Sequence, residues 1–148
     1  MSNDSTNAIL LVSQNIICDI YSSFSNSCYE SGGLIGSKED NVIDSFYYDK
    51  GKEERRHDYI PNVDELQHQL SIWNKEQIEF RGIIHSHLRC GELSQKDVNM
   101  ARRVLELNNI PSILMPIYII NKQIIVWYEV LNDNIVLRVP KTTKSGGR

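Results

Sequence analysis

The stretch GIIHSHLRCGELSQKD, Gly82 to Asp97, places two of the chain's four histidines one residue apart at the end of an apolar run. The run before them, IEFRGII, has the composition of a buried strand. Residues two apart in a strand point to the same side, so His85 and His87 project together while Ser86 faces away. The sequence therefore predicts a pair of imidazoles on one face of a sheet, which can chelate a metal.

A helix is expected after the histidines, from Ser94 to about Asn108, because its apolar residues recur at helical spacing. Asp97 falls in the first turn of this helix, near Ser94. Two neutral imidazoles and a carboxylate, with a fourth position left to water, form the ligand set of a catalytic zinc site. Ser94 and Asp97 alone also fit a helix-capping box, which needs no chemistry. His57 and His68 have no ligand partner at useful spacing.

The rest of the chain alternates apolar runs with amphipathic segments, which predicts a single mixed α/β domain over residues 1–140 and a flexible tail over 141–148. The expected strands cover residues 8–17, 32–36, 41–49, 78–87, 113–120, 121–130 and 134–140, and the expected helices cover 18–25, 62–76 and 94–108. A solvated charged loop is expected over residues 50–58.

Composition narrows the classes of partner. The net charge is −3 and the positive charges are scattered among negative ones, so we expect no nucleic-acid partner. No apolar run approaches 18 residues and the N-terminus is polar, so we expect a cytoplasmic protein without a membrane partner. Cys18, Cys28 and Cys90 are odd in number and unpatterned, which argues against a disulfide framework.

A zinc hydrolase also needs a carboxylate that takes a proton from water and passes it to the leaving amine. The candidate is Glu30 in CYESGGLIG, directly before a glycine-bounded apolar strand. Nothing else about Glu30 distinguishes it from an ordinary surface acid.

Glu30 followed by SGGLIG, then HSH with Ser94 and Asp97 behind it, resembles the pattern of the JAMM (MPN-type, JAB) zinc metalloproteases. The resemblance covers roughly Ala8 to Glu129. It implies a cytidine-deaminase-like α/β fold, a mixed β-sheet flanked by helices. It also implies zinc-dependent cleavage of isopeptide or peptide bonds at the C-terminus of ubiquitin or a ubiquitin-like protein.

Carried over position by position, the resemblance makes His85, His87 and Asp97 the Zn²⁺ ligands and Glu30 the general acid/base. Ser94 would donate a hydrogen bond to the oxyanion of the tetrahedral intermediate. Compact members resemble those of bacterial systems that pair the protease with E1-like or E2-like enzymes, including antiphage operons, or with ubiquitin-like sulfur carriers. The implied partners are thus a ubiquitin-like protein or its conjugates and such enzymes, and nothing in the residues chooses among these systems.

Three features depart from the family pattern. Leu88 stands where the family usually has proline, and the loop from His87 to Ser94 is one residue shorter than is common. Cys90 in this loop is either an ordinary loop residue, the reading we favour, or a thiolate that fills the open metal position. These departures leave a catalytically inactive MPN scaffold as the alternative function. A zinc nucleoside deaminase is excluded, because that class needs a CxxC motif and this chain has none.

Overall fold

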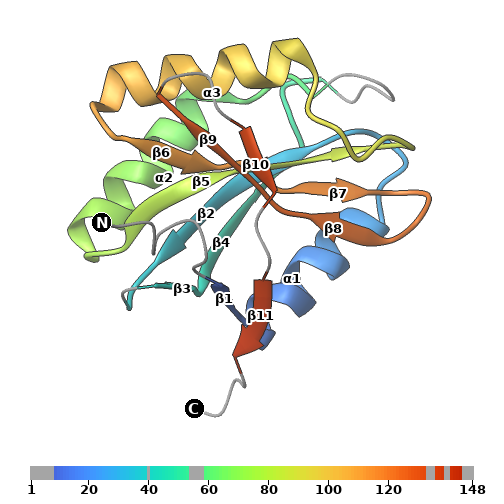
Figure 1. Ribbon diagram of the computed structural model, residues 1–148, viewed down its shortest axis with the longest axis horizontal. Helices are drawn as coiled ribbons and strands as arrows, with labels where there is room; N and C mark the ends of the chain where they lie inside the picture. The colour runs from blue at the N-terminus through green and yellow to red at the C-terminus, as the bar shows by residue number, and fades with distance from the viewer. Residues whose placement is uncertain (1–8, 40, 54–58, 133–135, 139–140, 145–148) are drawn as a thin grey trace.

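The computed structural model describes residues 9–39, 41–53, 59–132, 136–138 and 141–144. The helices are α1 (Gln14–Ser25), α2 (Val63–Lys75) and α3 (Gln95–Asn108). The strands are β1 (Leu10–Ser13), β2 (Gly32–Ser37), β3 (Val42–Ile43), β4 (Ser45–Asp49), β5 (Glu79–His87), β6 (Ser112–Leu114), β7 (Ile117–Ile119), β8 (Ile124–Val126), β9 (Tyr128–Leu131), β10 (Val136–Arg138) and β11 (Lys141–Lys144). Figure 1 shows their arrangement.

The main sheet is mixed, as the alternation of elements predicts. Its strands follow the order β10-β9-β6-β5-β2-β4, and the β7–β8 hairpin continues the sheet alongside the C-terminal half of β5. β5 runs antiparallel to β2 and parallel to both β6 and β7. A smaller parallel sheet has the order β11-β1-β3. β5, the strand that carries the histidines, is therefore flanked on both sides by other strands.

Helices cover both faces of the main sheet (Figure 1). On one face, α2 and α3 bury Leu66, Trp73, Ala101 and Leu105 against the strands. On the other face, α1 buries Ile16, Ile20 and Phe24 in a second apolar cluster. Burial of this apolar surface on both sides holds β5 in place, and with it the histidines at its C-terminal end. No helix among the described residues is long and apolar enough to cross a membrane.

The first strand is shorter than predicted, because α1 begins at Gln14 and not near Cys18. The predicted strand over 8–17 contains three Ile and one Val, which favours strand by local propensity. Ile16, Ile20 and Phe24, however, lie four residues apart and form the buried face of one helix. Packing of this face on the sheet outweighs the local preference.

Three predicted strands are each divided in the structure. The segment 41–49 is split at Asp44 into β3 and β4, which belong to different sheets. The segment 113–120 is split at Met115 and Pro116 into β6 and β7, and the segment 121–130 is split at Trp127 into β8 and β9. Pro116 has no N–H for a ladder, although its carbonyl accepts the His85 amide at 3.2 Å. The division between β6 and β7 lets both short strands pair with β5, at Gly82 and from His85 to His87.

Residues 141–144 of the expected flexible tail form β11, in parallel register with β1. The segment KTTK has no apolar periodicity, so its own sequence does not predict that it pairs as a strand. His57 and most of the expected charged loop lie outside the described residues. The predicted bounds of α2, α3, β2 and β5 are confirmed within one or two residues.

Candidate metal centre

The two histidines lie at the end of β5 and project to the same side, as predicted from strand periodicity. His85 is paired with Gly32 of β2 across the ladder. Continuing this register by two residues brings Glu30 opposite His87 and Ser31 opposite Ser86. Glu30 and the two histidines therefore share one face of the sheet, and Ser86 lies on the other face.

Asp97 comes to the histidines from the first turn of α3. The turn is closed by a capping box, in which the Ser94 hydroxyl accepts the Asp97 amide at 3.1 Å and Asp97 Oδ2 accepts the Ser94 amide at 2.9 Å. This reciprocal bonding turns the carboxylate back toward the strand. The short loop after His87 does not displace it, because Asp97 Oδ2 still reaches both imidazoles.

The three donor atoms form a nearly equilateral triangle. His85 Nε2 and His87 Nε2 are 3.1 Å apart, and Asp97 Oδ2 is 3.1 Å from the first and 3.3 Å from the second. Ligands of a tetrahedral zinc ion with bonds of 2.0–2.1 Å are separated by about 3.3 Å. The triangle thus has the size of one face of such a tetrahedron, and these residues form a group that can hold a metal ion.

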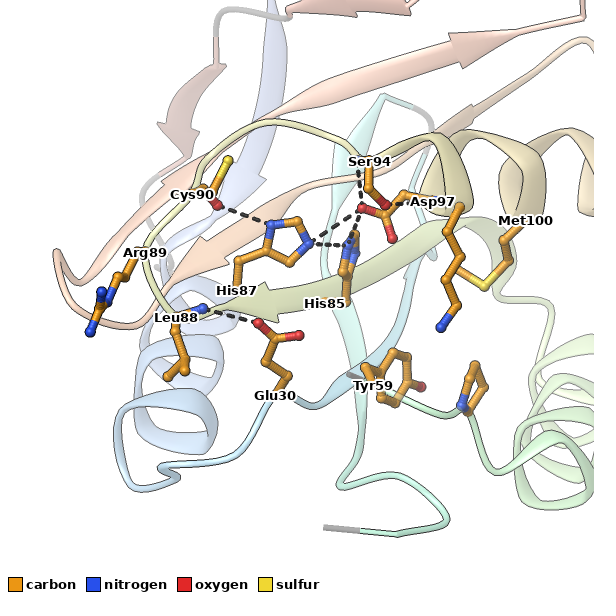
Figure 2. Close-up of a pocket in the computed structure, with 12 residues that line it drawn as sticks. Glu30, Tyr59, His85, His87, Leu88, Arg89, Cys90, Ser94, Asp97 and Met100 are labelled. Carbon is orange, nitrogen blue, oxygen red and sulfur yellow. Dashed lines mark hydrogen bonds and ion pairs between the residues drawn. The ribbon is translucent and has the colours of Figure 1, made fainter. Parts of the chain in front are cut away.

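Neighbouring groups orient the imidazoles (Figure 2). His87 Nδ1 lies 3.0 Å from the carbonyl oxygen of Cys90. Donation by Nδ1–H to this carbonyl leaves the lone pair on Nε2, the atom that faces Asp97. His85 Nδ1 is buried without a hydrogen-bond partner among the described residues. The carbonyl of Cys90, which follows no recognisable motif, is a contributor to the site that the sequence did not indicate.

The thiol of Cys90 does not take part in the metal group. Its sulfur accepts the Glu92 amide at 3.3 Å, and Figure 2 shows it turned away from the two histidines. The cluster of possible ligands found among the described residues consists of His85, His87 and Asp97. This geometry favours the reading of Cys90 as an ordinary loop residue over that of an inhibitory thiolate.

Charges at the site support metal binding by a carboxylate and two imidazoles. Burial alone would raise the pKa of Asp97, but hydrogen bonds with His85 and His87, the charge of His85 and the Ser94 amide hold this pKa well below its usual range. Burial alone would lower the pKa of His87, yet Asp97, and more weakly Glu30 and the Cys90 carbonyl, raise it overall. Asp97 is therefore ionised at neutral pH, and a cation is stabilised beside it.

The metal group opens into a cavity of about 660 Å³ (Figure 2). Glu30, Ser94 and the three ligands line it, and the other lining residues are Tyr59, Pro61, Leu88, Arg89, Cys90, Lys96 and Met100. The predicted catalytic residues and the predicted ligands are thus brought to one pocket by three separate parts of the chain. His68, one of the two histidines without a predicted role, is exposed on α2 and does not line this cavity.

The wall of the cavity beside His85 depends on Tyr59 and its hydrogen-bond partner Asp49. The sequence analysis did not single out either residue. The Tyr59 hydroxyl donates to Asp49 Oδ2 at 2.6 Å, and the Asn62 amide donates to the same oxygen at 2.9 Å. A Cβ on Gly32 would lie 2.4 Å from the Tyr59 ring, so glycine is required there. Burial, together with the Asp49 hydrogen bond and charge, raises the pKa of Tyr59, which remains a neutral donor.

Neither a family model nor a curated protein matches the sequence. Solved structures do match. Protein DSY2949 from Desulfitobacterium hafniense has a TM-score of 0.70 at 14% identity, over 93% of this chain and 94% of that one. AF2198, a JAB1/MPN domain protein from Archaeoglobus fulgidus, has a TM-score of 0.52 at 12% identity, over 91% and 99% of the two chains.

A third structure, described as a JAMM metalloprotease-like zinc site in the proteasome and signalosome, has a TM-score of 0.50 at 12% identity, with coverage of 91% and 99%. Identities at this level show the fold alone. The chain has the JAB/MPN-type fold, a mixed sheet flanked by helices, which confirms the expected fold class. On that fold it carries a His-His-Asp group compatible with a metal ion.

Proposed function

We propose that the chain is a zinc-dependent isopeptidase or peptidase that cleaves after the C-terminus of a ubiquitin-like protein. One observation carries the hydrolase part of this proposal: the zinc-sized triangle of His85, His87 and Asp97 faces the same cavity as Glu30. The ubiquitin-like substrate is supported by the resemblance of the motif to the JAMM family. The pairing with E1-like or E2-like enzymes rests on that resemblance as well.

The residues at the site divide the work of peptide hydrolysis among them. Zinc held by the triangle would polarise the scissile carbonyl and lower the pKa of a water molecule towards neutrality. Glu30 takes the proton from the attacking water and passes it to the leaving amine. Ser94 accepts the Asp97 amide through an oxygen lone pair, so its own hydrogen remains for the oxyanion of the substrate. Capping and catalysis therefore do not exclude each other.

The apolar part of the cavity lining supports a peptide substrate. Tyr59, Pro61, Leu88 and Met100 supply apolar surface beside the metal group. Tyr59 cannot serve as a base, because its raised pKa keeps it protonated and its hydrogen is donated to Asp49. The apolar residues bind and orient the peptide, while proton transfer is left to Glu30.

Cleavage of defined substrates tests the proposal. Zinc-loaded protein is incubated with ubiquitin-like proteins that carry a C-terminal peptide extension or an isopeptide-linked lysine peptide, and mass spectrometry locates the new C-terminus. We expect cleavage after the last residue of the ubiquitin-like protein, loss of cleavage with a chelator and recovery with zinc. The His87→Ala variant, purified in parallel, controls for contaminating proteases. Stoichiometric zinc binding without cleavage of any substrate would favour the inactive scaffold.

A further inference from the structure

Ser86, the residue between the two histidines, has no part in the proposed chemistry. It is fully buried (0% exposed) on the face of the sheet opposite the metal group. Its neighbour across the strands, Ser31, is also buried (1% exposed) and directly follows Glu30 in the chain. Buried hydroxyls require hydrogen-bond partners. The Ser86 hydroxyl finds them on the backbone of Ser31, and the Ser31 hydroxyl accepts from that of Tyr48.

The contact between the two serines differs from a regular strand pair. The Ser86 amide donates to the Ser31 carbonyl at 2.8 Å, as in an ordinary antiparallel ladder. A regular pair would return the Ser31 amide to the Ser86 carbonyl, but here the Ser86 hydroxyl accepts it at 2.9 Å. The same hydroxyl is 3.3 Å from the Ser31 carbonyl, to which it donates. The side chain of Ser86 thus supplies half of the link between the two segments.

This link lies one residue from the proposed base. β2 begins only at Gly32, so Glu30 and Ser31 lie before the regular strand. The Ser86 hydroxyl fixes the backbone of Ser31, and the side chain of Glu30 then extends along the other face toward His87. There, Glu30 Oε2 accepts the Leu88 amide at 3.2 Å (Figure 2). The position of the carboxylate therefore depends on a hydroxyl buried on the far side of the sheet.

We propose that Ser86 is a positioning residue, whose hydroxyl fixes the Glu30–Ser31 backbone against β5 so that the Glu30 carboxylate lies beside the metal group. Its kinetic consequence rests on the proposed function, but its structural consequence does not. Misplacement of a catalytic group by about 1 Å can lower a rate by about a hundredfold. Ser86→Ala is expected to lower kcat by about that factor, with KM within about twofold of wild type.

Two readouts separate positioning from general stability. The first is kcat and KM of folded, zinc-saturated protein, and the second is hydrogen exchange of the Ser31 and Leu88 amides by NMR in metal-free protein. Tyr48→Phe is the matched control, because the Tyr48 hydroxyl donates to the Ser31 side chain at 3.0 Å without touching the backbone link. Ser86→Thr keeps the hydroxyl and should restore the rate.

We expect Ser86→Ala to speed exchange of both amides at least about tenfold, whereas Tyr48→Phe leaves both protected. If Ser86→Ala does not fold, Ser86→Cys keeps the side-chain volume with a weak acceptor and should give the same pattern. Unchanged protection of both amides in the folded variant would overturn the inference. If the wild type cleaves no ubiquitin-like substrate, the proposed function fails, while the exchange data still decide the role of Ser86.

Discussion

The backbone amide of Leu88 donates a hydrogen bond to Oε2 of Glu30 at 3.2 Å. This amide belongs to the residue directly after the second histidine, where the JAMM family usually has proline. Proline has no N–H, so it could not make this contact. The amide occupies one oxygen of the carboxylate that is proposed to accept a proton from water.

Leu88→Pro should therefore raise kcat by several-fold, because the Leu88 amide no longer competes with water for the Glu30 carboxylate. His87 lies in a strand, so the backbone before the new proline already has a permitted conformation. Steady-state kinetics on the best substrate give the comparison. Leu88→Ala keeps the amide and should match wild type. A proline variant with wild-type kcat and full zinc content would show that this hydrogen bond does not restrain Glu30.

The wild-type protein should bind about one zinc ion per chain, and His87→Ala should lose most of it, since a tetrahedral site needs three protein ligands besides water. Metal content after dialysis against weak chelator measures the difference. His68→Ala is the matched control, because His68 is exposed on α2 and outside the site. Full zinc content in His87→Ala would refute the ligand assignment.

Glu30→Gln should keep the fold and the zinc but lower kcat by about 10²–10⁴-fold, because an amide cannot transfer the proton. The substitution preserves the shape of the side chain and its ability to accept the Leu88 amide. Circular dichroism and zinc content serve as controls for the kinetic measurement. Undiminished turnover by this variant would remove Glu30 from the mechanism.

Ser94 caps α3 in the structure, and its proposed catalytic role can be separated from capping. Ser94→Ala should cost about 0.5–2 kcal/mol of stability through loss of the cap. Ser94→Asn keeps a good cap but no hydroxyl, so it should retain the melting temperature and lose about a hundredfold or more in kcat. Thermal melts and kcat of both variants are needed. Wild-type kcat in the Asn variant would leave capping as the whole role of Ser94.

As pH rises from about 6.5, the stability of the metal-free protein should fall while its affinity for zinc should rise. The contact with Asp97 raises the pKa of His87 above 6.5 in the folded chain. This contact therefore contributes its full stability below about pH 6.5, and the contribution is lost as pH rises through the folded-state pKa of His87. Asp97, whose pKa is lowered from 3.8, loses its contribution only in acid. Zinc needs neutral His87, so its affinity should rise over the range in which this stabilisation fades.

Thermal melts of metal-free protein between pH 6 and 8.5, and zinc titration calorimetry in buffers of different ionisation enthalpy, measure the two trends. Proton release on zinc binding should decrease as pH rises. His87→Gln removes the titrating group and should flatten the dependence of stability on pH. Zinc affinity that is constant across this range would contradict the expected displacement of a proton from His87.

Local periodicity was sufficient to predict that His85, His87 and Asp97 come together in a group that can hold a metal ion. The two-residue repeat of a strand put His85 and His87 on one side, and the first turn of a helix put Asp97 near Ser94. Glu30 was different, because its pairing opposite His87 is set by the β2–β5 register, a contact between segments more than fifty residues apart. Only the family resemblance indicated Glu30 from sequence.

Apart from the local contact of the Cys90 carbonyl with His87, the features that the sequence did not predict depend on packing between separate segments of the chain. The helical start at Gln14 follows from burial of Ile16 and Ile20 against the sheet. The wall formed by Tyr59 depends on Asp49, across a loop with no periodicity. β11 depends on its pairing with β1 at the other end of the chain. Propensity and spacing contain no information on such contacts.

One oxygen atom, Asp97 Oδ2, both accepts the Ser94 amide at the start of α3 and completes the metal triangle. A chain in which this helix has frayed would offer zinc only the two histidines of β5. A zinc ion bound as proposed would therefore distinguish the native chain from partly folded forms, and it would stabilise the native chain by RT ln(1 + [Zn]/Kd). Misfolded copies would then bind no zinc, and the proposed enzyme would have proteolytic activity only in its native form.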